Sequence, residues 1–216
     1  MNIVDHAIED YMRSLMPSPD PVRAEMEALG AKRNFPIIGP LVGNFCALQA
    51  RAIQARRVFE MGSGFGYSTL WFARAVGPGG LVVHTEGSAD NSRQARDFLE
   101  RAGVAAWVRF EVGDAREVLS AEIRGGDTLP FDVVFCDMDK EQYPDALPMA
   151  RRALRKGGLL ICDNMLWSGK VLEPASADEA TRGILEMTRL LRQAEDFQTT
   201  WVPLRDGVTV SLKLKD

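Results

Sequence analysis

Residues 56–70 read RRVFEMGSGFGYSTL and pass from polar to apolar to glycine-rich within one short stretch. The apolar run predicts a β-strand, and the pattern after the glycines predicts a helix. Gly62, Gly64 and Gly66 permit a tight turn and a close approach of backbone amides to a ligand, and the start of the helix offers unpaired donors. Taken alone this is a tight strand-to-helix connection; beside the acidic residues described below it indicates a ligand-binding loop.

The same alternation of short apolar runs and helical patterns continues along the chain, which predicts parallel strands buried on both faces. We expect a doubly wound α/β sheet that ends in an antiparallel hairpin, whose Asp-Gly pair at 206–207 suits a tight turn. The expected strands are 81–86, 108–114, 131–137, 158–164, 199–204 and 208–214, and the expected helices are 40–54, 90–102, 143–157 and 178–193.

Residues 3–33 have a helical pattern that prolines at 17, 19 and 21 interrupt, which predicts two short helices. We expect one domain over 1–216, in which 1–35 is a helical appendage and 36–216 the catalytic core.

Composition excludes several classes of function. The 216 residues are 46% hydrophobic and carry a net charge of −4, which predicts a globular chain that binds neither nucleic acid nor membrane. Three cysteines without CxxC spacing and only two histidines predict neither a disulfide framework nor a zinc site, so any metal needs oxygen ligands. The N-terminus lacks the pattern of a signal peptide, from which we expect a cytoplasmic location.

The spacing of the glycines favours one class of cofactor. It is GxGxG, whereas a dinucleotide pyrophosphate is bound by GxGxxG, and Glu60 before the loop would repel a diphosphate. Glu60 suits a ligand ammonium or the loop amides, and Glu86 at the end of the next strand suits two ribose hydroxyls. S-adenosylmethionine has these groups and no phosphate. Asp114-Ala115 follows the third strand, where Asp114 either contacts the base or caps the next helix.

Polar side chains also follow the fourth and fifth strands of the core. Asp137, Asp163 and Asn164 lie where adjacent parallel strands end at one edge of the sheet, so they can converge on Mg²⁺ or a similar ion. The alternative for Asp163 and Asn164 is a simple Asx turn. Lys140, three residues after Asp137, can act as a base beside a cation; the alternative is a solvated lysine in a charged run.

Four runs together resemble the cation-dependent O-methyltransferase family: FEMGSGFGYSTL at 59–70, VVHTEG at 82–87, FDVVFCDMDKEQY at 131–143 and GGLLICDNMLWSGKV at 157–171. The resemblance implies a Rossmann-like class I methyltransferase sheet of seven strands, mostly parallel, with helices on both faces, and a homodimer. It implies that Lys140 is the base and that Asp137, Asp163 and Asn164 hold the ion. The implied cofactor contacts are Ile38, Glu60, Gly62, Ser63, Gly64, Ser68, Glu86, Gly87, Asp114, Ala115 and Asp137.

These observations predict methyl transfer from S-adenosylmethionine to a metal-chelated hydroxyl of a small molecule, one of two adjacent aromatic hydroxyls. Two alternatives are a module that binds S-adenosylmethionine without catalysis and a nicotinamide-dependent reductase. Trp167 and the first thirty or so residues either shape the acceptor pocket or only pack.

Overall fold

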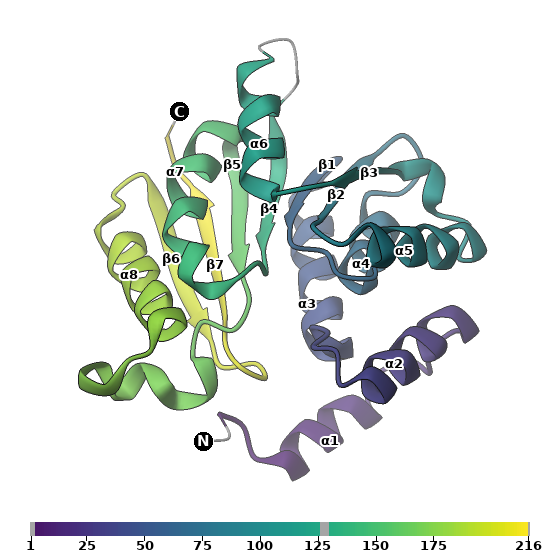
Figure 1. Ribbon diagram of the computed structural model, residues 1–216, viewed down its shortest axis with the longest axis horizontal. Coiled ribbons are helices and arrows are strands. Elements are labelled where there is room, and N and C mark those ends of the chain that lie inside the picture. Colours follow the sequence, from purple (N-terminus) through teal and green to yellow (C-terminus); the bar gives the residue numbers. More distant parts are fainter. Residues whose placement is uncertain (1–2, 126–129, 216) are drawn as a thin grey trace.

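The computed structural model describes residues 3–125 and 130–215, and its centre is one sheet of seven strands (Figure 1). The strand order is β3-β2-β1-β4-β5-β7-β6, with β1 to β5 parallel and β7 antiparallel to both β5 and β6. The expected α/β sheet with an antiparallel C-terminal hairpin is confirmed. The strands are β1 (Arg57–Met61), β2 (Leu81–Glu86), β3 (Val108–Val112), β4 (Phe131–Cys136), β5 (Leu154–Cys162), β6 (Phe197–Val202) and β7 (Val208–Lys213).

Helices cover both faces of this sheet, as Figure 1 shows. One face packs on α3 (Gly39–Ala52), α4 (Tyr67–Val76) and α5 (Ala89–Arg101), and the other on α6 (Ala115–Arg124), α7 (Tyr143–Ala153) and α8 (Glu179–Gln193). Because both faces are covered, β1 and β4 at the centre of the sheet are buried over nearly their whole length. Short 3₁₀ turns complete the chain: η1 (Ala105–Trp107), η2 (Lys140–Gln142), η3 (Trp167–Leu172) and η4 (Pro174–Ser176).

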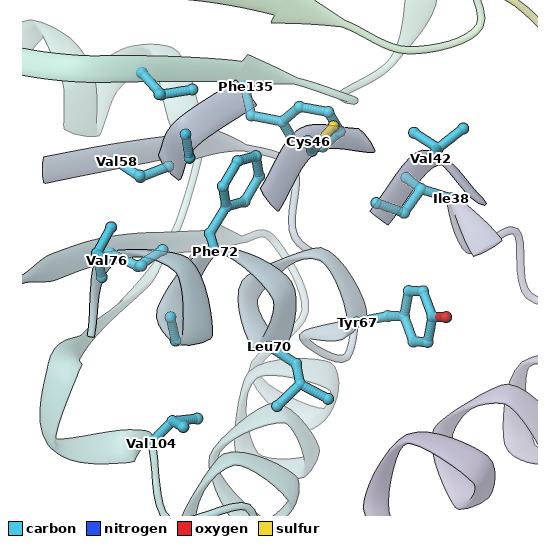
Figure 2. Packing of buried hydrophobic residues seen from close by; sticks show 14 of the residues in the cluster. Ile38, Val42, Cys46, Val58, Tyr67, Leu70, Phe72, Val76, Val104 and Phe135 are labelled. Carbon is cyan, nitrogen blue, oxygen red and sulfur yellow. The ribbon is translucent and has the colours of Figure 1, made fainter. Parts of the chain in front are cut away.

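The core on the α3–α5 side is built from aromatic and branched side chains (Figure 2). The rings of Phe72 on α4 and Phe135 on β4 lie 5.4 Å apart at a tilt, a favourable aromatic geometry. Tyr67 is buried but turns its hydroxyl out of the cluster, where it donates to Glu27 at 2.7 Å. This core fixes the start of α4, and with it the glycine loop.

The N-terminal segment forms two helices, α1 (His6–Ser14) and α2 (Pro21–Arg33), as the prolines predicted. Asp20 caps α2 by accepting a hydrogen bond from the Arg23 amide at 3.2 Å, and Pro21 occupies the first helical position. No helix within the described residues has the length and hydropathy needed to cross a bilayer.

Most boundaries differ from the prediction by one or two residues, and two regions differ more. β5 begins at Leu154 and not at 158, because the chain leaves α7 directly into the sheet and absorbs an irregularity in register opposite Phe131 and Val133. The hairpin between β6 and β7 is not a tight two-residue turn. Residues 203–207 form the connection, with Arg205 at φ 49° and Gly207 at φ 85°.

The strand order reverses between β1 and β4, and this point positions the site. The ladder of hydrogen bonds continues one residue past the strands: the Asp137 amide donates to Met61 O at 2.9 Å, and the Asp163 amide donates to Cys136 O at 3.1 Å. The residues that follow β1, β4 and β5 therefore stand in a row at the carboxyl edge of the sheet.

Candidate active site

A cavity of about 920 Å³ opens at this edge of the sheet. It is lined by residues that follow β1, β2, β3, β4 and β5, by the segment 35–38, and by parts of η3, α8 and the β6–β7 connection. Of the residues predicted from the sequence, all but Glu60 line it: Ile38, Gly62, Ser63, Gly64, Ser68, Glu86, Gly87, Asp114, Ala115, Asp137, Lys140, Asp163 and Asn164.

The glycine loop fits closely against the neighbouring strand end. Gly62 has φ 87°, a conformation that other residues rarely adopt, and a Cβ there would lie 2.6 Å from Asp137 O. Gly66, at φ 86°, directly precedes α4, whose first turn has no side-chain cap. The loop therefore leaves backbone amides of the helix start directed at the cavity, as expected of a ligand-binding turn.

Glu60 lies beneath this loop instead of in the cavity. Its buried carboxylate accepts hydrogen bonds from Thr69 Oγ1 at 2.6 Å and from Ser63 Oγ at 3.3 Å. Burial raises the pKa of Glu60 to about 7, although the hydroxyl donors act in the opposite direction. The loop amides were predicted as donors to Glu60, but the loop donor that the structure shows is the Ser63 hydroxyl.

Thr69 extends this network to His84, whose Nδ1 lies 3.1 Å from Thr69 Oγ1. Because the Thr69 hydroxyl donates its one proton to Glu60, Nδ1 of His84 is the donor to Thr69. Burial lowers the pKa of His84 to about 4, with Arg96 adding to the shift, so the ring is neutral. Glu60, Thr69 and His84 thus support the loop from inside the protein.

Two further acids stand on the cofactor side of the cavity. Glu86 accepts from the Ser88 amide at 2.8 Å and from Asn91 Nδ2 at 3.4 Å, both on Oε1. Asp114 accepts from the Arg116 amide at 2.7 Å and pairs with the Arg116 guanidinium at 2.7 Å, which lowers the pKa of Asp114. Asp114 is therefore the cap of α6, as one of the two interpretations held, and it also faces the cavity.

Asp137, Asp163 and Asn164 meet at the other end of the cavity. Asp163 is 2% exposed, and its Oδ1 has no hydrogen-bond partner within the described part of the chain. Burial and the charge of Asp137 raise the pKa of Asp163 to about 7. Burial also raises the pKa of Asp137, against the influence of Lys140. A buried carboxylate without a partner, beside a second carboxylate, is an arrangement that a cation would stabilise.

Asn164 adopts φ 57° and donates through Nδ2 to Asp206 Oδ2 at 3.4 Å, so its amide oxygen is turned away from Asp206. In 3–125 and 130–215 no three His, Cys, Asp or Glu side chains form a metal-binding group. The oxygen set here is instead two carboxylates and one amide, which suits a hard divalent cation such as Mg²⁺ that keeps further positions for water and substrate.

Lys140 lies between the two carboxylate-bearing strand ends and two aromatic rings. Its Nζ donates to Asp137 Oδ1 at 2.8 Å and to Met138 O at 3.1 Å. The rings of Tyr143 and Trp167 lie 4.8 and 5.8 Å from it. Burial alone would lower the pKa of Lys140, but the charge of Asp137 and its hydrogen bond outweigh burial and raise it. Lys140 is thus not a solvated surface lysine.

Sequence reasoning gave no site role to Asp206. This residue accepts from Asn164 Nδ2 and from the Ser168 amide, so it orients the proposed amide ligand from the opposite end of the chain. The Asp-Gly pair was the only signal, and it was interpreted as a turn. Trp167 also lines the cavity, as one of its two interpretations predicted.

The sheet order and the glycine loop at its switch point define the class I, S-adenosylmethionine-dependent methyltransferase fold. Within that class the chain belongs to the O-methyltransferase family, whose model matches residues 23–214. It is therefore an S-adenosylmethionine-dependent O-methyltransferase, which agrees with the resemblance noted in the sequence and is at odds with the two alternative functions.

Among curated relatives, the catechol O-methyltransferase of Mycobacterium tuberculosis is 38% identical over 175 residues, covering 80% of this chain and 77% of the relative. The catechol O-methyltransferase of Niastella koreensis is 33% identical over 216 residues, covering 97% and 96%. Among solved structures, the O-methyltransferase TomG from Streptomyces achromogenes, in complex with S-adenosylmethionine, has a TM-score of 0.89 at 30% identity and coverage of 97% and 96%.

Proposed function

We propose that this O-methyltransferase requires a divalent cation and methylates one of two adjacent hydroxyls on an aromatic small molecule. Asp137, Asp163 and Asn164 would hold the cation, and Lys140 would accept the proton of the attacking hydroxyl. The two relatives named catechol O-methyltransferase support this substrate class, since a catechol is an aromatic ring with two adjacent hydroxyls.

The observation that carries the proposal is the buried, unpartnered Oδ1 of Asp163 beside Asp137. An isolated buried carboxylate is destabilising, so the pair needs compensation by positive charge. Lys140 supplies one positive charge, and it is bound to Asp137. The oxygen donors therefore suit Mg²⁺, which when bound would supply the charge that orients the acceptor oxygens and lowers the pKa of an acceptor hydroxyl.

The position of Lys140 in the cavity wall, in addition to its charge, suits it to proton transfer. Asp137 and Met138 O fix Nζ at the cavity wall, and the rings of Tyr143 and Trp167 limit its movement. Asp137 is also what keeps Lys140 protonated. A cation held by Asp137 would weaken this effect and lower the pKa of Lys140, so that the neutral Nζ would accept the proton of the acceptor hydroxyl.

On the cofactor side, the Gly64 amide and the Ser68 hydroxyl would contact the methionine part. Gly62 and Ser63 would lie beside it, because their own amides donate to Thr85. Glu86 has Oε2 available for the ribose hydroxyls, because its hydrogen bonds within the described residues use Oε1. Asp114 and Ala115 would face the adenine, and Ile38 would close the cavity over the cofactor. Together these residues would position the methyl group of the cofactor. The expected gain in reaction rate comes from this orientation.

The test is a methylation assay with labelled S-adenosylmethionine and two isomeric acceptors, catechol and resorcinol. Catechol has adjacent hydroxyls and resorcinol does not. We expect methylation of catechol that EDTA abolishes and excess Mg²⁺ restores, and little methylation of resorcinol. Equal rates with EDTA and with Mg²⁺ would refute the cation requirement, and equal rates on both acceptors would refute the vicinal substrate. The homodimer, the cytoplasmic location and the domain boundary at residue 36 stay predictions.

A further inference from the structure

Tyr143 ends the DMDKEQY run, and the proposed function uses only its ring, which lies beside Lys140, and not its hydroxyl. It is the first residue of α7, directly after the η2 turn that begins with Lys140. Its side chain is fully buried, and its hydroxyl lies 3.0 Å from Asp163 O and 3.3 Å from Cys136 O. Backbone carbonyls only accept, so the hydroxyl is the donor, and its single proton is shared between the two.

These two carbonyls belong to the two strand ends that carry the proposed ligands. Cys136 immediately precedes Asp137, and Cys136 O also accepts the last ladder hydrogen bond, from the Asp163 amide at 3.1 Å. Asp163 O belongs to the peptide that leads into Asn164, where the backbone turns to φ 57°. The Tyr143 hydroxyl therefore joins β4 and β5 at the point where their regular hydrogen bonding stops.

The ring of the same residue faces the proposed base. Lys140 Nζ lies 4.8 Å from the centre of the Tyr143 ring, within the range of a cation–π contact. One side chain thus contacts Lys140 through its ring and the backbone of both strand ends through its hydroxyl. Within the described residues, Tyr143 therefore connects Lys140 with the two ligand-bearing strand ends, on the side that faces away from the cavity.

Packing alone explains why an aromatic ring occupies position 143, but it does not explain why this ring carries a hydroxyl. Tyr143 belongs to the apolar cluster on the α6–α8 side, with Leu160, Met187 and Cys162 among its members. Phenylalanine would fill the same space, and a hydroxyl in such surroundings is unfavourable unless it is hydrogen-bonded. The two carbonyls that satisfy it are those of the ligand-bearing strand ends.

We propose that Tyr143 is a positioning residue for the divalent-cation centre: its hydroxyl sets the spacing of Asp137 relative to Asp163 and Asn164, and its ring orients Lys140. This inference rests on the proposed function. Tyr143 is given no contact with substrate or cofactor. Its hydroxyl is expected to affect the affinity for the ion, and its ring is expected to affect turnover.

The experiment is a calorimetric titration of Mg²⁺ into the full chain saturated with S-adenosylhomocysteine, for the wild type and for Tyr143→Phe. We expect Tyr143→Phe to bind Mg²⁺ about 10-fold more weakly, to bind S-adenosylmethionine as the wild type does, and to regain most of its turnover at saturating Mg²⁺. The matched control is Thr199→Val, which removes a hydroxyl that donates to Ser211 Oγ at 2.8 Å in the β6–β7 hairpin. It should leave Mg²⁺ affinity unchanged.

A second variant, Tyr143→Met, fills the ring's volume with neither hydroxyl nor aromatic face. We expect it to bind Mg²⁺ as weakly as Tyr143→Phe and to stay slow at saturating Mg²⁺; it also decides the question of the hydroxyl if Tyr143→Phe does not fold. Mg²⁺ affinity equal to that of the wild type in either variant would overturn the role of Tyr143, even if the melting temperature fell. A wild-type chain that binds no Mg²⁺ would overturn the proposed function itself, and this inference with it.

Discussion

The two ends of the cavity are built in different ways. At the cofactor end, at β1 to β3, the cavity wall is formed by glycines at positive φ and the start of α4, and a buried network of side chains supports the loop from behind. The ion end, at β4 and β5, is made of charged side chains that segments distant in sequence hold in place, among them Asp206 and α8. Substitutions at the cofactor end should therefore mainly affect cofactor binding and folding. Substitutions at the ion end should mainly affect the chemical step.

The largest expected effect tests the ion end. Lys140→Ala removes the proposed base, and we expect turnover to fall about 10²- to 10⁴-fold, with S-adenosylmethionine affinity nearly unchanged. Steady-state kinetics and calorimetry measure the two quantities. Lys170→Ala is the matched control, because Lys170 lies 5.5 Å from the same Trp167 ring but is exposed and pairs with Asp178. Full turnover in Lys140→Ala would remove Lys140 from the mechanism.

A smaller effect, on the pH dependence of the free energy of unfolding, tests how the buried network at the cofactor end contributes to folding. Unfolded His84 takes up a proton below pH 6.5, whereas the folded residue does so only near pH 4. The unfolded state therefore binds more protons in this window, and the free energy of unfolding falls as the pH falls. His84→Gln should lose this dependence, a difference of about 3 kcal/mol between the ends of the window.

Urea unfolding of both proteins across that window gives the comparison directly. Glu60 and Asp163 act in the opposite sense, because their pKa values rise from 4.5 and 3.8 to about 7, so the slope of the wild type alone does not report on His84. The variant keeps Glu60 and isolates His84. Parallel stability curves for the two proteins would show that His84 is not held neutral in the fold.

The smallest effect tests how α8 supports the ion end. Gly183 on α8 lies so close to the η2 turn that a Cβ would overlap Lys140 O and Glu141 Cα. Gly183→Ala should lower the free energy of unfolding by about 2 kcal/mol and reduce turnover by displacing Lys140. Gly125→Ala, where the nearest atoms would lie 3.5 Å away, should change neither. A neutral Gly183→Ala would mean that α8 does not fix Lys140.

The strands and the glycine loop were predictable because local pattern determines them. The position of Glu60 follows the same rule in retrospect: strand alternation places it on the same face as Val58, toward Thr69 of α4, and not at the edge. The early start of β5 was missed because residues 154–157 continue the pattern of α7, and only pairing with β4 draws them into the sheet.

The ion end was predictable only in part. Asp137, Asp163 and Asn164 could be brought together from the rule that parallel strands end at one edge. Asp206 and Tyr143 act through hydrogen bonds to residues 42 and 20 positions away. No spacing in the sequence encodes such contacts, since they depend on how the last hairpin and α7 fold back onto the sheet.

Asp137 and Asp163 are held as the next rungs of the sheet's own ladder. Their separation is therefore close to the distance between neighbouring strands, about 4.8 Å, and the Tyr143 hydroxyl maintains it where the regular strand pairing ends. Any two acids at these two adjacent strand ends would be held as a pair at that spacing. Phe35, Trp167 and Ala180 line the cavity from other segments, so substitutions there can reshape the space for an acceptor without moving the pair.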